Sequence, residues 1–291
     1  MRNVLLIGGT GFVGGALARR LAGADFFVTL PTRRPERVRH LALLPTARIL
    51  AADVHDAATL ARLMAEQDVV ISLVGMLKGN FQRGHAELPA KIARAAQAAG
   101  VPRLIHISSL GAAADAPSEY LRTKATGEEA LRAVFPAATI FQPSVIFGRG
   151  DSFLTLFAGL LKLVPLVPLA CPEARFQPVW IEDVVSAVVK SIDRSESAGH
   201  TYPLCGPREY SLRELVAYAG QVSGHPRPIV GLPLPLAYLQ AFMMELLPNG
   251  PMTRDNVRSM QKPNVCPAGC TLPFGLKAAP LEAIAPGYLS C

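Results

Sequence analysis

A serine, a tyrosine and a lysine have the types and spacing needed for proton transfer to a carbonyl compound. Tyr120 and Lys124 are four residues apart, so on a helix they share one face and the ammonium can lie beside the phenol. That proximity favours the phenolate and makes Tyr120 a proton donor and acceptor near neutral pH. Ser109 ends an apolar run and would hydrogen-bond the carbonyl oxygen of a substrate. We therefore predict a catalytic site of Ser109, Tyr120 and Lys124.

The first elements of the chain supply a site for a dinucleotide cofactor. An apolar strand at 4–7 runs into glycines spaced G-x-x-G-x-x-G and then into a helix at 14–21. Gly8 permits the tight turn, Gly11 lets backbone N–H groups approach the phosphates, and Gly14 brings the helix onto the strand. This context favours a pyrophosphate on the helix N-terminus over a glycine-rich turn without a ligand. The predicted contacts are Gly8, Thr10, Gly11, Phe12, Val13 and Gly14.

The end of the second strand, expected over 26–30, distinguishes the two nicotinamide cofactors. An enzyme that binds the ribose 2′-hydroxyl of NAD places an Asp or Glu there, whereas this chain reads Leu30-Pro31-Thr32-Arg33-Arg34. Two guanidinium groups can bind a 2′-phosphate. Thr32, Arg33 and Arg34 therefore predict a preference for NADP(H), with NAD(H) as the alternative. The competing interpretation is two solvated loop arginines.

The third strand ends at Asp53 and Val54, which would meet the adenine of the cofactor. The Asp53 carboxylate could accept a hydrogen bond from the adenine amino group. An Asp is also an ordinary helix-capping residue, and Asp56 is placed to cap a helix from residue 57.

Apolar runs alternate with helical patterns through the first half of the chain, which is typical of a parallel sheet with crossover helices. The predicted strands are 4–7, 26–30, 48–51, 69–73, 104–108 and 139–142, and the predicted helices are 14–21, 57–66, 89–99 and 120–134. After Gln142 the alternation loosens and prolines become frequent. We predict an α/β fold: a Rossmann-type doubly wound parallel sheet with a smaller interleaved C-terminal substrate or cap region. The expected divisions are a nucleotide-binding core at 1–145, a cap segment at 146–176, a return to the core at 177–206 and a C-terminal region at 207–291.

Composition narrows the classes of partner. The chain has 291 residues, of which 50% are hydrophobic, and a net charge of +7. Its basic residues are scattered with no aromatic-interleaved run, so we expect no nucleic acid. A positive mean hydropathy keeps a membrane surface in view, although Pro165 and Pro168 interrupt the most apolar stretch and argue against a span. Because Met1 runs directly into the first strand, we expect no targeting peptide and a cytoplasmic protein, or one peripheral to the inner face of the membrane.

The five cysteines form no C-x-x-C pair. Their odd number and spacing favour reduced thiols over a disulfide framework. No second cysteine pair or histidine cluster completes a metal site, so we expect no metal.

These motifs resemble those of the extended or atypical short-chain dehydrogenases/reductases over nearly the whole chain. They also resemble a narrower branch, the bacterial relatives of the NAD(P)H-binding accessory subunit of respiratory complex I. The segments that carry this resemblance are Thr32-Arg33-Arg34, His106-Ile107-Ser108-Ser109-Leu110-Gly111-Ala112, Pro143-Ser144-Val145-Ile146-Phe147-Gly148, Gln177-Pro178-Val179-Trp180-Ile181-Glu182-Asp183-Val184 and Leu204-Cys205-Gly206-Pro207.

The resemblance assigns further cofactor contacts. It implies that Lys124 also holds the hydroxyls of the nicotinamide ribose and that Val74-Gly75 lines the cofactor. It places Pro143-Ser144-Val145 beside the nicotinamide.

Two positions depart from the family pattern. Active extended members often carry an Asn after the fourth strand, where it supports a proton relay, and the matching segment here is His85-Ala86-Glu87. The motif before Pro143 usually begins with Arg, and this chain has Gln142. Both departures bear on turnover more than on cofactor binding.

Two functions follow from the sequence. The first, which we favour, is an NADP(H)-dependent oxidoreductase that acts on an apolar carbonyl or alcohol, such as a quinone- or isoprenoid-related one. It rests on Ser109, Tyr120 and Lys124, and on an apolar cap formed by Phe153, Leu154, Leu156, Phe157, Leu160 and Leu161. Simple core packing is the competing interpretation of that cap. The second function is a nucleotide-binding structural or assembly protein of a membrane respiratory complex, without turnover, because the nucleotide of the accessory-subunit branch is thought to be structural.

The segment 234–247 is expected to form an unusually apolar helix. Leu236, Leu239, Phe242, Met243, Leu246 and Leu247 recur at helical spacing. The resulting stripe is wider than a surface helix needs. We expect part of it to cover the substrate cleft or the sheet, with contact to lipid or to a membrane-bound partner as the alternative.

Overall fold

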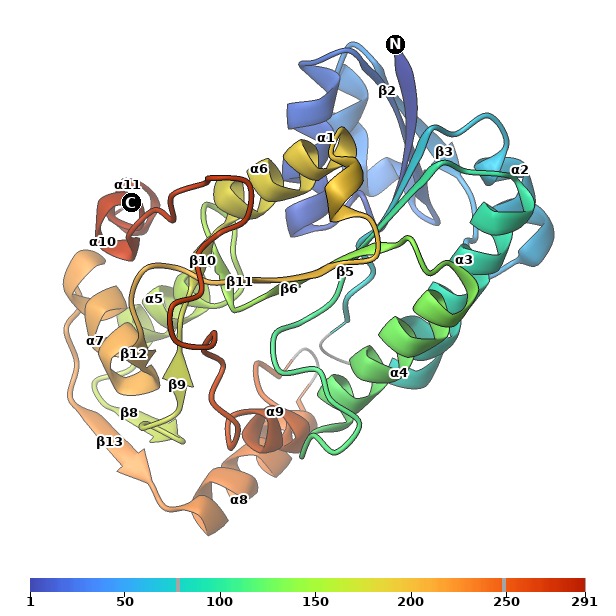
Figure 1. Cartoon of the computed structure of the whole chain (residues 1–291). Helices are drawn as coiled ribbons and strands as arrows, with labels where there is room; N and C mark the ends of the chain where they lie inside the picture. The colour runs from blue at the N-terminus through green and yellow to red at the C-terminus, as the bar shows by residue number, and fades with distance from the viewer. Residues whose placement is uncertain (77–78, 248–249, 291) are drawn as a thin grey trace.

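Seven parallel strands form the centre of the molecule, in the order β11-β6-β5-β4-β1-β2-β3 (Figure 1). The structure is a computed structural model that describes residues 1–76, 79–247 and 250–290. The strands span Arg2–Ile7 (β1), Phe26–Thr32 (β2), Ala47–Ala51 (β3), Val69–Ser72 (β4), Arg103–Ile107 (β5), Thr139–Pro143 (β6) and Thr201–Leu204 (β11). The order reverses between β4 and β1, which confirms the predicted doubly wound Rossmann-type sheet. Sequence patterning missed β11, an edge strand that tolerates Pro203.

Helices cover both faces of this sheet (Figure 1). One face carries α1 (Phe12–Ala22) and α6 (Ile181–Ile192), and the other carries α2 (Ala57–Met64), α3 (Leu88–Ala98) and α4 (Glu119–Val134). Side chains of β1 alternate between them, because Val4 and Leu6 pack with α1 and α6 while Leu5 and Ile7 pack with α2 and α3. A sheet covered on both faces needs apolar residues at every position, which explains the continuous apolar run of β1. A π-helical turn, Gln82–Glu87, precedes α3, and 3₁₀ segments occupy Pro35–Leu43 and Ser195–Ser197.

A smaller lobe contains most of the elements after β6. Its two-stranded sheets pair β7 (Ile146–Phe147) with β10 (Val179–Trp180), β8 (Val167–Ala170) with β13 (Ile229–Leu232), and β9 (Arg175–Phe176) with β12 (Tyr210–Ser211). Its helices are α5 (Leu154–Leu163), α7 (Leu212–Val222), α8 (Leu234–Glu245), α9 (Arg254–Ser259), α10 (Leu281–Ile284) and α11 (Pro286–Leu289). A second apolar core joins α5, α7, α10 and α11.

The apolar helix predicted at 234–247 forms as α8, but it leaves most of its apolar side chains in solvent. Only Ala237 and Ala241 are buried within α8. The exposed large apolar residues along this segment are Leu234, Leu236, Leu239, Phe242, Met243, Leu246 and Leu247. The expectation that part of the stripe would cover the cleft or the sheet is therefore wrong for these larger side chains. Among the residues that the structure describes, no helix combines the length and apolarity needed to cross a membrane.

Candidate functional site

The turn after β1 ends in an open helix N-terminus. Gly8 has a φ of 85°, and a Cβ there would lie 3.0 Å from the backbone of Leu73. A Cβ on Gly14 would lie 2.5 Å from the carbonyl oxygen of Gly8, whereas one on Gly11 would meet only that oxygen, at 3.4 Å. Among the residues with a described position, no side chain caps α1, and its first turn holds no acidic residue. The turn, which also contains Thr10, Phe12 and Val13, therefore fits a pyrophosphate that accepts hydrogen bonds from free backbone amides.

The arginines predicted to bind a 2′-phosphate lie at the end of β2. The hydroxyl of Thr32, the last residue of β2, accepts a hydrogen bond from the Arg34 amide at 3.3 Å. Arg33 and Arg34 are exposed, and neither forms an ion pair with any residue that the structure describes. Their charges are thus accessible to an anion at this corner of the site.

Two acidic residues after β3, Asp53 and Asp56, form different hydrogen bonds. Asp53 is exposed and accepts a hydrogen bond from the His55 amide at 3.0 Å, which tightens the turn after the strand. Asp56 caps α2 through the amide of Thr59 at 2.7 Å, as the sequence suggested. Val54 packs against the core under α2, so it supports this turn from inside.

Helix α4 positions Tyr120 and Lys124, and side chains hold its first amides. Ser118 accepts a hydrogen bond from the Leu121 amide at 3.3 Å. Asp255, in α9, accepts from the amides of Glu119 at 2.8 Å and Tyr120 at 3.0 Å. Sequence reasoning missed Asp255, because it lies 135 residues from Tyr120 along the chain and nothing in its neighbourhood indicates a partner.

Lys124 is buried beneath the loop that follows β4. Its Nζ donates to the carbonyl oxygens of Val74 at 3.1 Å and Ile107 at 3.4 Å. A Cβ on Gly75 would lie 3.8 Å from that nitrogen. The structure therefore brings Val74-Gly75 and Lys124 together. Burial lowers the pKa of Lys124 to about 8, and the charge of Glu128 partly opposes this effect.

Tyr120 and Ser109 meet at the ends of α4 and β5. Burial raises the pKa of the Tyr120 phenol, and a hydrogen bond with the Ser109 side chain lowers it by a smaller amount. Desolvation thus dominates the phenol, whereas the sequence led us to expect that Lys124 would favour the phenolate. Ser109 nevertheless lies beside Tyr120 at the carboxyl end of the sheet, and Lys124 lies one helical turn further along α4.

A histidine takes up the space beside Tyr120. The ring of His85 meets the Tyr120 ring edge-on, with centroids 5.2 Å apart. Phe81 stacks on His85 at 5.4 Å and also meets the Tyr120 ring edge-on at 6.0 Å. His85 Nε2 accepts a hydrogen bond from the Met76 amide at 2.9 Å, so Nδ1 carries the proton and faces the Thr123 hydroxyl at 3.4 Å. Burial lowers the pKa of His85 to about 3. This position, where active extended relatives often have Asn, therefore holds a neutral imidazole with both nitrogens engaged.

The second departure from the family pattern also has a partner. Gln142 Nε2 donates to both carboxylate oxygens of Glu128, at 2.9 and 3.0 Å. Burial raises the pKa of Glu128. A neutral amide in the place of Arg thus leaves this half-buried carboxyl without a full counter-charge at that side.

The loop Pro143-Ser144-Val145 is held by an asparagine from the C-terminal region. Asn264 Oδ1 accepts hydrogen bonds from the Ser144 hydroxyl at 2.6 Å and the Val145 amide at 3.2 Å. Its Nδ2 donates to the carbonyl oxygen of Leu110, next to Ser109, at 3.2 Å. Asn264 therefore joins the two loops that follow β5 and β6. Nothing in the local sequence around Asn264 predicts this, because all of its partners are distant along the chain.

The predicted cap residues pack mainly with their own lobe. Leu154 and Leu161 are buried in the core between α5 and α7, and Phe153 and Phe157 pack against that core. Leu156 is exposed. Core packing therefore explains most of this helix.

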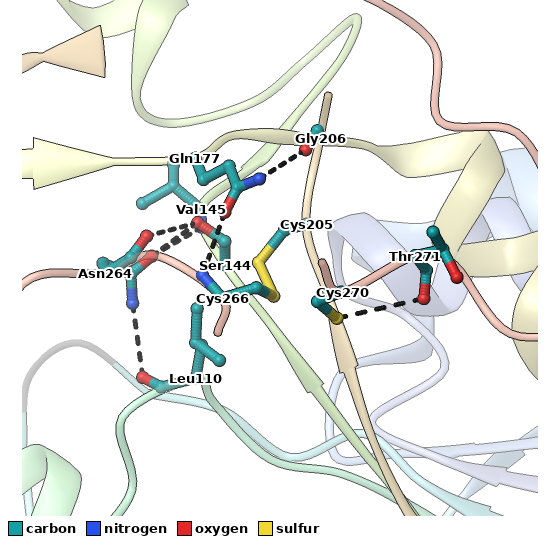
Figure 2. The surroundings of a disulfide bond; sticks show 10 residues. All are labelled: Leu110, Ser144, Val145, Gln177, Cys205, Gly206, Asn264, Cys266, Cys270 and Thr271. Atoms are coloured by element: carbon teal, nitrogen blue, oxygen red, sulfur yellow. Dashed lines mark hydrogen bonds between the residues drawn. A yellow bond between two sulfur atoms is a disulfide. The ribbon is translucent and has the colours of Figure 1, made fainter. Parts of the chain in front are cut away.

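A disulfide overturns the expectation of reduced thiols. Cys205, just after β11, is bonded to Cys266, with their Cα atoms 6.1 Å apart (Figure 2). Cys171 and Cys270 are free, and Cys291 lies outside the described residues. The odd count and the absence of a C-x-x-C pair misled the prediction, because the bridge joins segments 61 residues apart that only the fold brings together.

Comparisons with known proteins agree with this geometry. An NAD(P)H-binding family model matches residues 8–147. Mouse (Mus musculus) mitochondrial NADH dehydrogenase (ubiquinone) 1 alpha subcomplex subunit 9 is 33% identical over 295 residues, which cover 95% of this chain and 77% of that protein. The chain spans a smaller share, 63%, of the rat counterpart. A ceramide reductase from Caulobacter vibrioides is 30% identical over 240 residues, covering 80% of this chain and 74% of the relative.

A solved structure shows the same fold. A double mutant of the dTDP-glucose 4,6-dehydratase DesIV from Streptomyces venezuelae, with NAD bound, superposes with a TM-score of 0.68. It is 20% identical, and the match covers 79% of this chain and 84% of that one. These relatives lead to one conclusion: the chain belongs to the family of NADH dehydrogenase (ubiquinone) 1 alpha subcomplex subunit 9, and its residues 8–147 match an NAD(P)H-binding family model.

Proposed function

We propose that the protein is an NADP(H)-dependent oxidoreductase that interconverts an apolar carbonyl compound and its alcohol. One observation carries the proposal: the Ser109 side chain lies close enough to the Tyr120 phenol to lower its pKa, and Lys124, one turn further along α4, donates to the carbonyl of Val74. A scaffold that only bound nucleotide would need the glycine turn, but it would not need a phenol and a hydroxyl side by side at the end of β5.

The chain supplies binding, orientation and a proton. The cofactor would contribute a hydride at the substrate carbon. Ser109 would orient the carbonyl oxygen, and Tyr120 would deliver a proton from its hydroxyl to that oxygen during reduction. Lys124, with a pKa lowered to about 8, would hold ribose hydroxyls. Arg33 and Arg34 would hold the 2′-phosphate and so favour NADP(H) over NAD(H).

A lipid carbonyl is the substrate class that we infer. The Caulobacter relative is named for ceramide, which is a lipid. The exposed apolar side chains of α8 offer a surface for contact with a bilayer, and α8 packs on α9, whose Asp255 binds the amide of Tyr120. We therefore propose that the protein works at the inner face of a membrane and takes its substrate from there.

Isotope transfer tests the proposal. NADPH deuterated at the reactive carbon is incubated with an amide-bearing long-chain ketone in mixed micelles, and the product alcohol is examined by mass spectrometry. We expect one deuterium on the carbinol carbon, and none when Tyr120→Phe replaces the wild type. Nucleotide binding without isotope transfer to this or any other carbonyl in a lipid and quinone panel would contradict the proposal.

A specific observation favours a second function, a nucleotide-binding subunit or assembly protein of a membrane complex. His85 fills the relay position, and its Nε2 is occupied by the amide of Met76. The mouse relative is named as a subunit of NADH dehydrogenase. Co-purification from detergent-solubilised membranes decides between the two: a stoichiometric complex without any turnover would favour the subunit.

A further inference from the structure

Three cysteines converge beside the loops of the nucleotide site. Cys205 and Cys266, both buried, form the bridge, and with Leu110 they make a small apolar cluster against which Cys270 packs (Figure 2). Cys270 is a free thiol and half-buried. Intramolecular exchange requires a thiol near a bridge sulfur, and Cys270 packs against the bridged pair while its thiol faces the Thr271 carbonyl at 3.9 Å.

The chain between Cys266 and Cys270 turns back on itself. The amide of Cys270 donates to the carbonyl oxygen of Pro267 at 3.0 Å, which closes a tight turn. Gly269 has a φ of 78°, a conformation that glycine adopts without strain. This turn returns Cys270 towards Cys266, so a local Cys266–Cys270 bridge is an alternative to the long-range one. The local bridge closes a far shorter loop than the existing bridge, whose cysteines are 61 residues apart.

The existing bridge fixes the segment that supports the nucleotide site. Two residues before Cys266, Asn264 holds Ser144, the Val145 amide and the carbonyl of Leu110. The Cys266 amide donates to Gln177 Oε1 at 2.9 Å, and Gln177 Nε2 donates to the Gly206 carbonyl at 2.8 Å. The bridge, Asn264 and Gln177 therefore act together on the loops after β5, β6 and β11.

We propose that Cys205, Cys266 and Cys270 form a thiol–disulfide exchange switch that sets the affinity of the nucleotide site. The Cys270 thiolate attacks Cys266 Sγ, a Cys266–Cys270 bond forms, and the Cys205–Cys266 bond breaks. Cys205 leaves as a thiolate and takes up the proton that Cys270 lost. The number of thiols and disulfides is unchanged, so the step needs no external oxidant or reductant.

The two bridges would have different effects on the site. With Cys205 released, the C-terminal segment keeps its hydrogen bonds to Arg175 and Gln177 but has no covalent cross-link to the loop after β11. Asn264 then loses the covalent restraint that helps to keep it on Ser144 and Val145. Burial raises the pKa of the Cys270 thiol, so exchange is slow while the segment stays packed. Nucleotide binding and the Cys205–Cys266 bridge should therefore stabilise each other, because coupling between two equilibria is reciprocal.

Disulfide mapping and nucleotide titration test this switch without any assay of turnover. Each protein is alkylated, digested without reduction and mapped by mass spectrometry, and its NADPH affinity is measured by calorimetry. Cys270→Ser should keep the Cys205–Cys266 bridge and the tight affinity. Cys205→Ser should contain the Cys266–Cys270 bridge and bind NADPH about fivefold more weakly or worse. Cys171→Ser removes the other free cysteine that the structure describes and should match the wild type.

Wild-type protein gives a second readout that does not depend on a variant folding correctly. Incubation at pH 8 should yield a measurable Cys266–Cys270 species, and saturating NADPH should reduce its share. No such species under either condition, or equal NADPH affinities of Cys205→Ser and Cys270→Ser, would overturn the switch. These results are independent of the proposed reaction, whose failure would appear as absent isotope transfer with nucleotide binding intact.

Discussion

At the carboxyl end of the large sheet, the loops of the candidate site follow the strands directly. In the C-terminal third, the residues that contact the same site belong to elements that are distant along the chain. Gly8, Arg33, Asp53, Val74 and Ser109 each stand within a few residues of a strand end, and the parallel sheet aligns them. Asn264 and Asp255 instead bond residues of the site that are 120 and 135 positions away along the chain. The sheet edge would be recognisable in any relative with the same local patterns, whereas the C-terminal contacts depend on the finished fold.

The two regions also differ in how they treat apolar surface. Both faces of the large sheet are covered, so β4 is wholly buried and β1 is buried from Val4 to Ile7. By contrast, Leu239 and Met243 of α8 and Leu246 just after it are 55% to 64% exposed. Soluble proteins rarely expose contiguous apolar surface of this kind unless something binds it. We therefore propose that the carboxyl end of the sheet carries the chemistry and that the C-terminal third contacts other molecules.

Removal of the phenol should have the largest effect and would establish the sheet edge as the chemical region. Tyr120→Phe should lower turnover by about 10²- to 10⁴-fold and leave NADPH affinity unchanged, because the lost hydroxyl acts only on the proton. Lys124→Ala should impair both turnover and binding. Tyr238→Phe, which loses one hydrogen bond from Gln261 on the surface of α8, is the matched control. Full activity in Tyr120→Phe would refute the proton-transfer role.

Acid should weaken the sheet region through two buried histidines. Burial lowers the pKa values of His85 and His106 to about 3, below the usual value of 6.5. The unfolded chain therefore binds more protons than the folded one below pH 6.5, and stability falls as the pH drops. Between pH 7 and pH 5, urea unfolding should show a loss of about 2 kcal/mol for each histidine.

The histidine assignment has its own control. The free energy of unfolding should differ less between pH 7 and pH 5 in His106→Gln than in the wild type, by about 2 kcal/mol, because one titrating group is gone. His40→Gln replaces an exposed histidine and should leave the difference unchanged. Equal pH dependence in all three proteins would mean that His106 titrates normally.

Loss of Asn264 should show how far the C-terminal third contributes to the sheet edge. Asn264→Ala leaves the Ser144 hydroxyl, the Val145 amide and the Leu110 carbonyl without this partner, so we expect about 1–3 kcal/mol less stability and weaker NADPH binding. Asn3→Ala loses one hydrogen bond, to the Glu66 carbonyl, at the opposite end of β1 and should not affect NADPH. If calorimetry gives both variants wild-type affinity, the loop contact is merely structural.

The cofactor preference should change by a smaller amount. Arg33→Ala removes a charge-assisted contact of about 1.5–3 kcal/mol and should weaken NADPH about tenfold or more while barely affecting NADH. Arg39→Ala, which removes an exposed charge from the segment that follows β2, is the control. Equal affinities of the intact protein for NADPH and NADH would show that the strand end does not select the phosphate.

Membrane contact is expected to be the weakest effect. The protein should sediment in part with anionic vesicles at low salt, and the double variant Phe242→Glu, Met243→Glu should abolish this while NADPH still binds. Phe27→Glu with Leu43→Glu changes two exposed apolar residues of the nucleotide region and should leave sedimentation intact. If neither variant nor wild type sediments, α8 has no affinity for anionic lipid.

Local patterns were sufficient for six of the seven strands of the sheet, and the roles of the candidate site residues stay predictions. An apolar run followed by Gly8, Gly11 and Gly14 determines a strand, a turn and a helix within a few residues, and the Tyr120–Lys124 spacing determines a shared helix face. The seventh strand escaped notice because Pro203 and its short length resemble a loop. The close backbone approaches at Gly8 and Gly14 could be predicted because the turn itself requires them.

Residues whose partners are distant could not be found in this way. No pattern near Cys205 or Cys266 indicates that they form a disulfide. The odd number of cysteines favoured reduced thiols, which was wrong for this pair. The exposure of α8 could not be predicted either. An apolar stripe indicates that the helix is covered, but it does not show whether the protein's own core or another molecule covers it. The burial that raises the pKa of Tyr120 depends on Phe81 and His85, which no spacing rule connects to it.

A structure of the protein with NADPH would test the central claim most directly, because it locates both ends of the cofactor at once. We predict the 2′-phosphate against Arg33 and Arg34, the pyrophosphate on the amides that follow Gly11, and the nicotinamide between Tyr120 and the loop Pro143-Ser144-Val145. A nucleotide bound with its nicotinamide turned away from Tyr120, or held at another surface, would contradict the assignment of chemistry to the sheet edge.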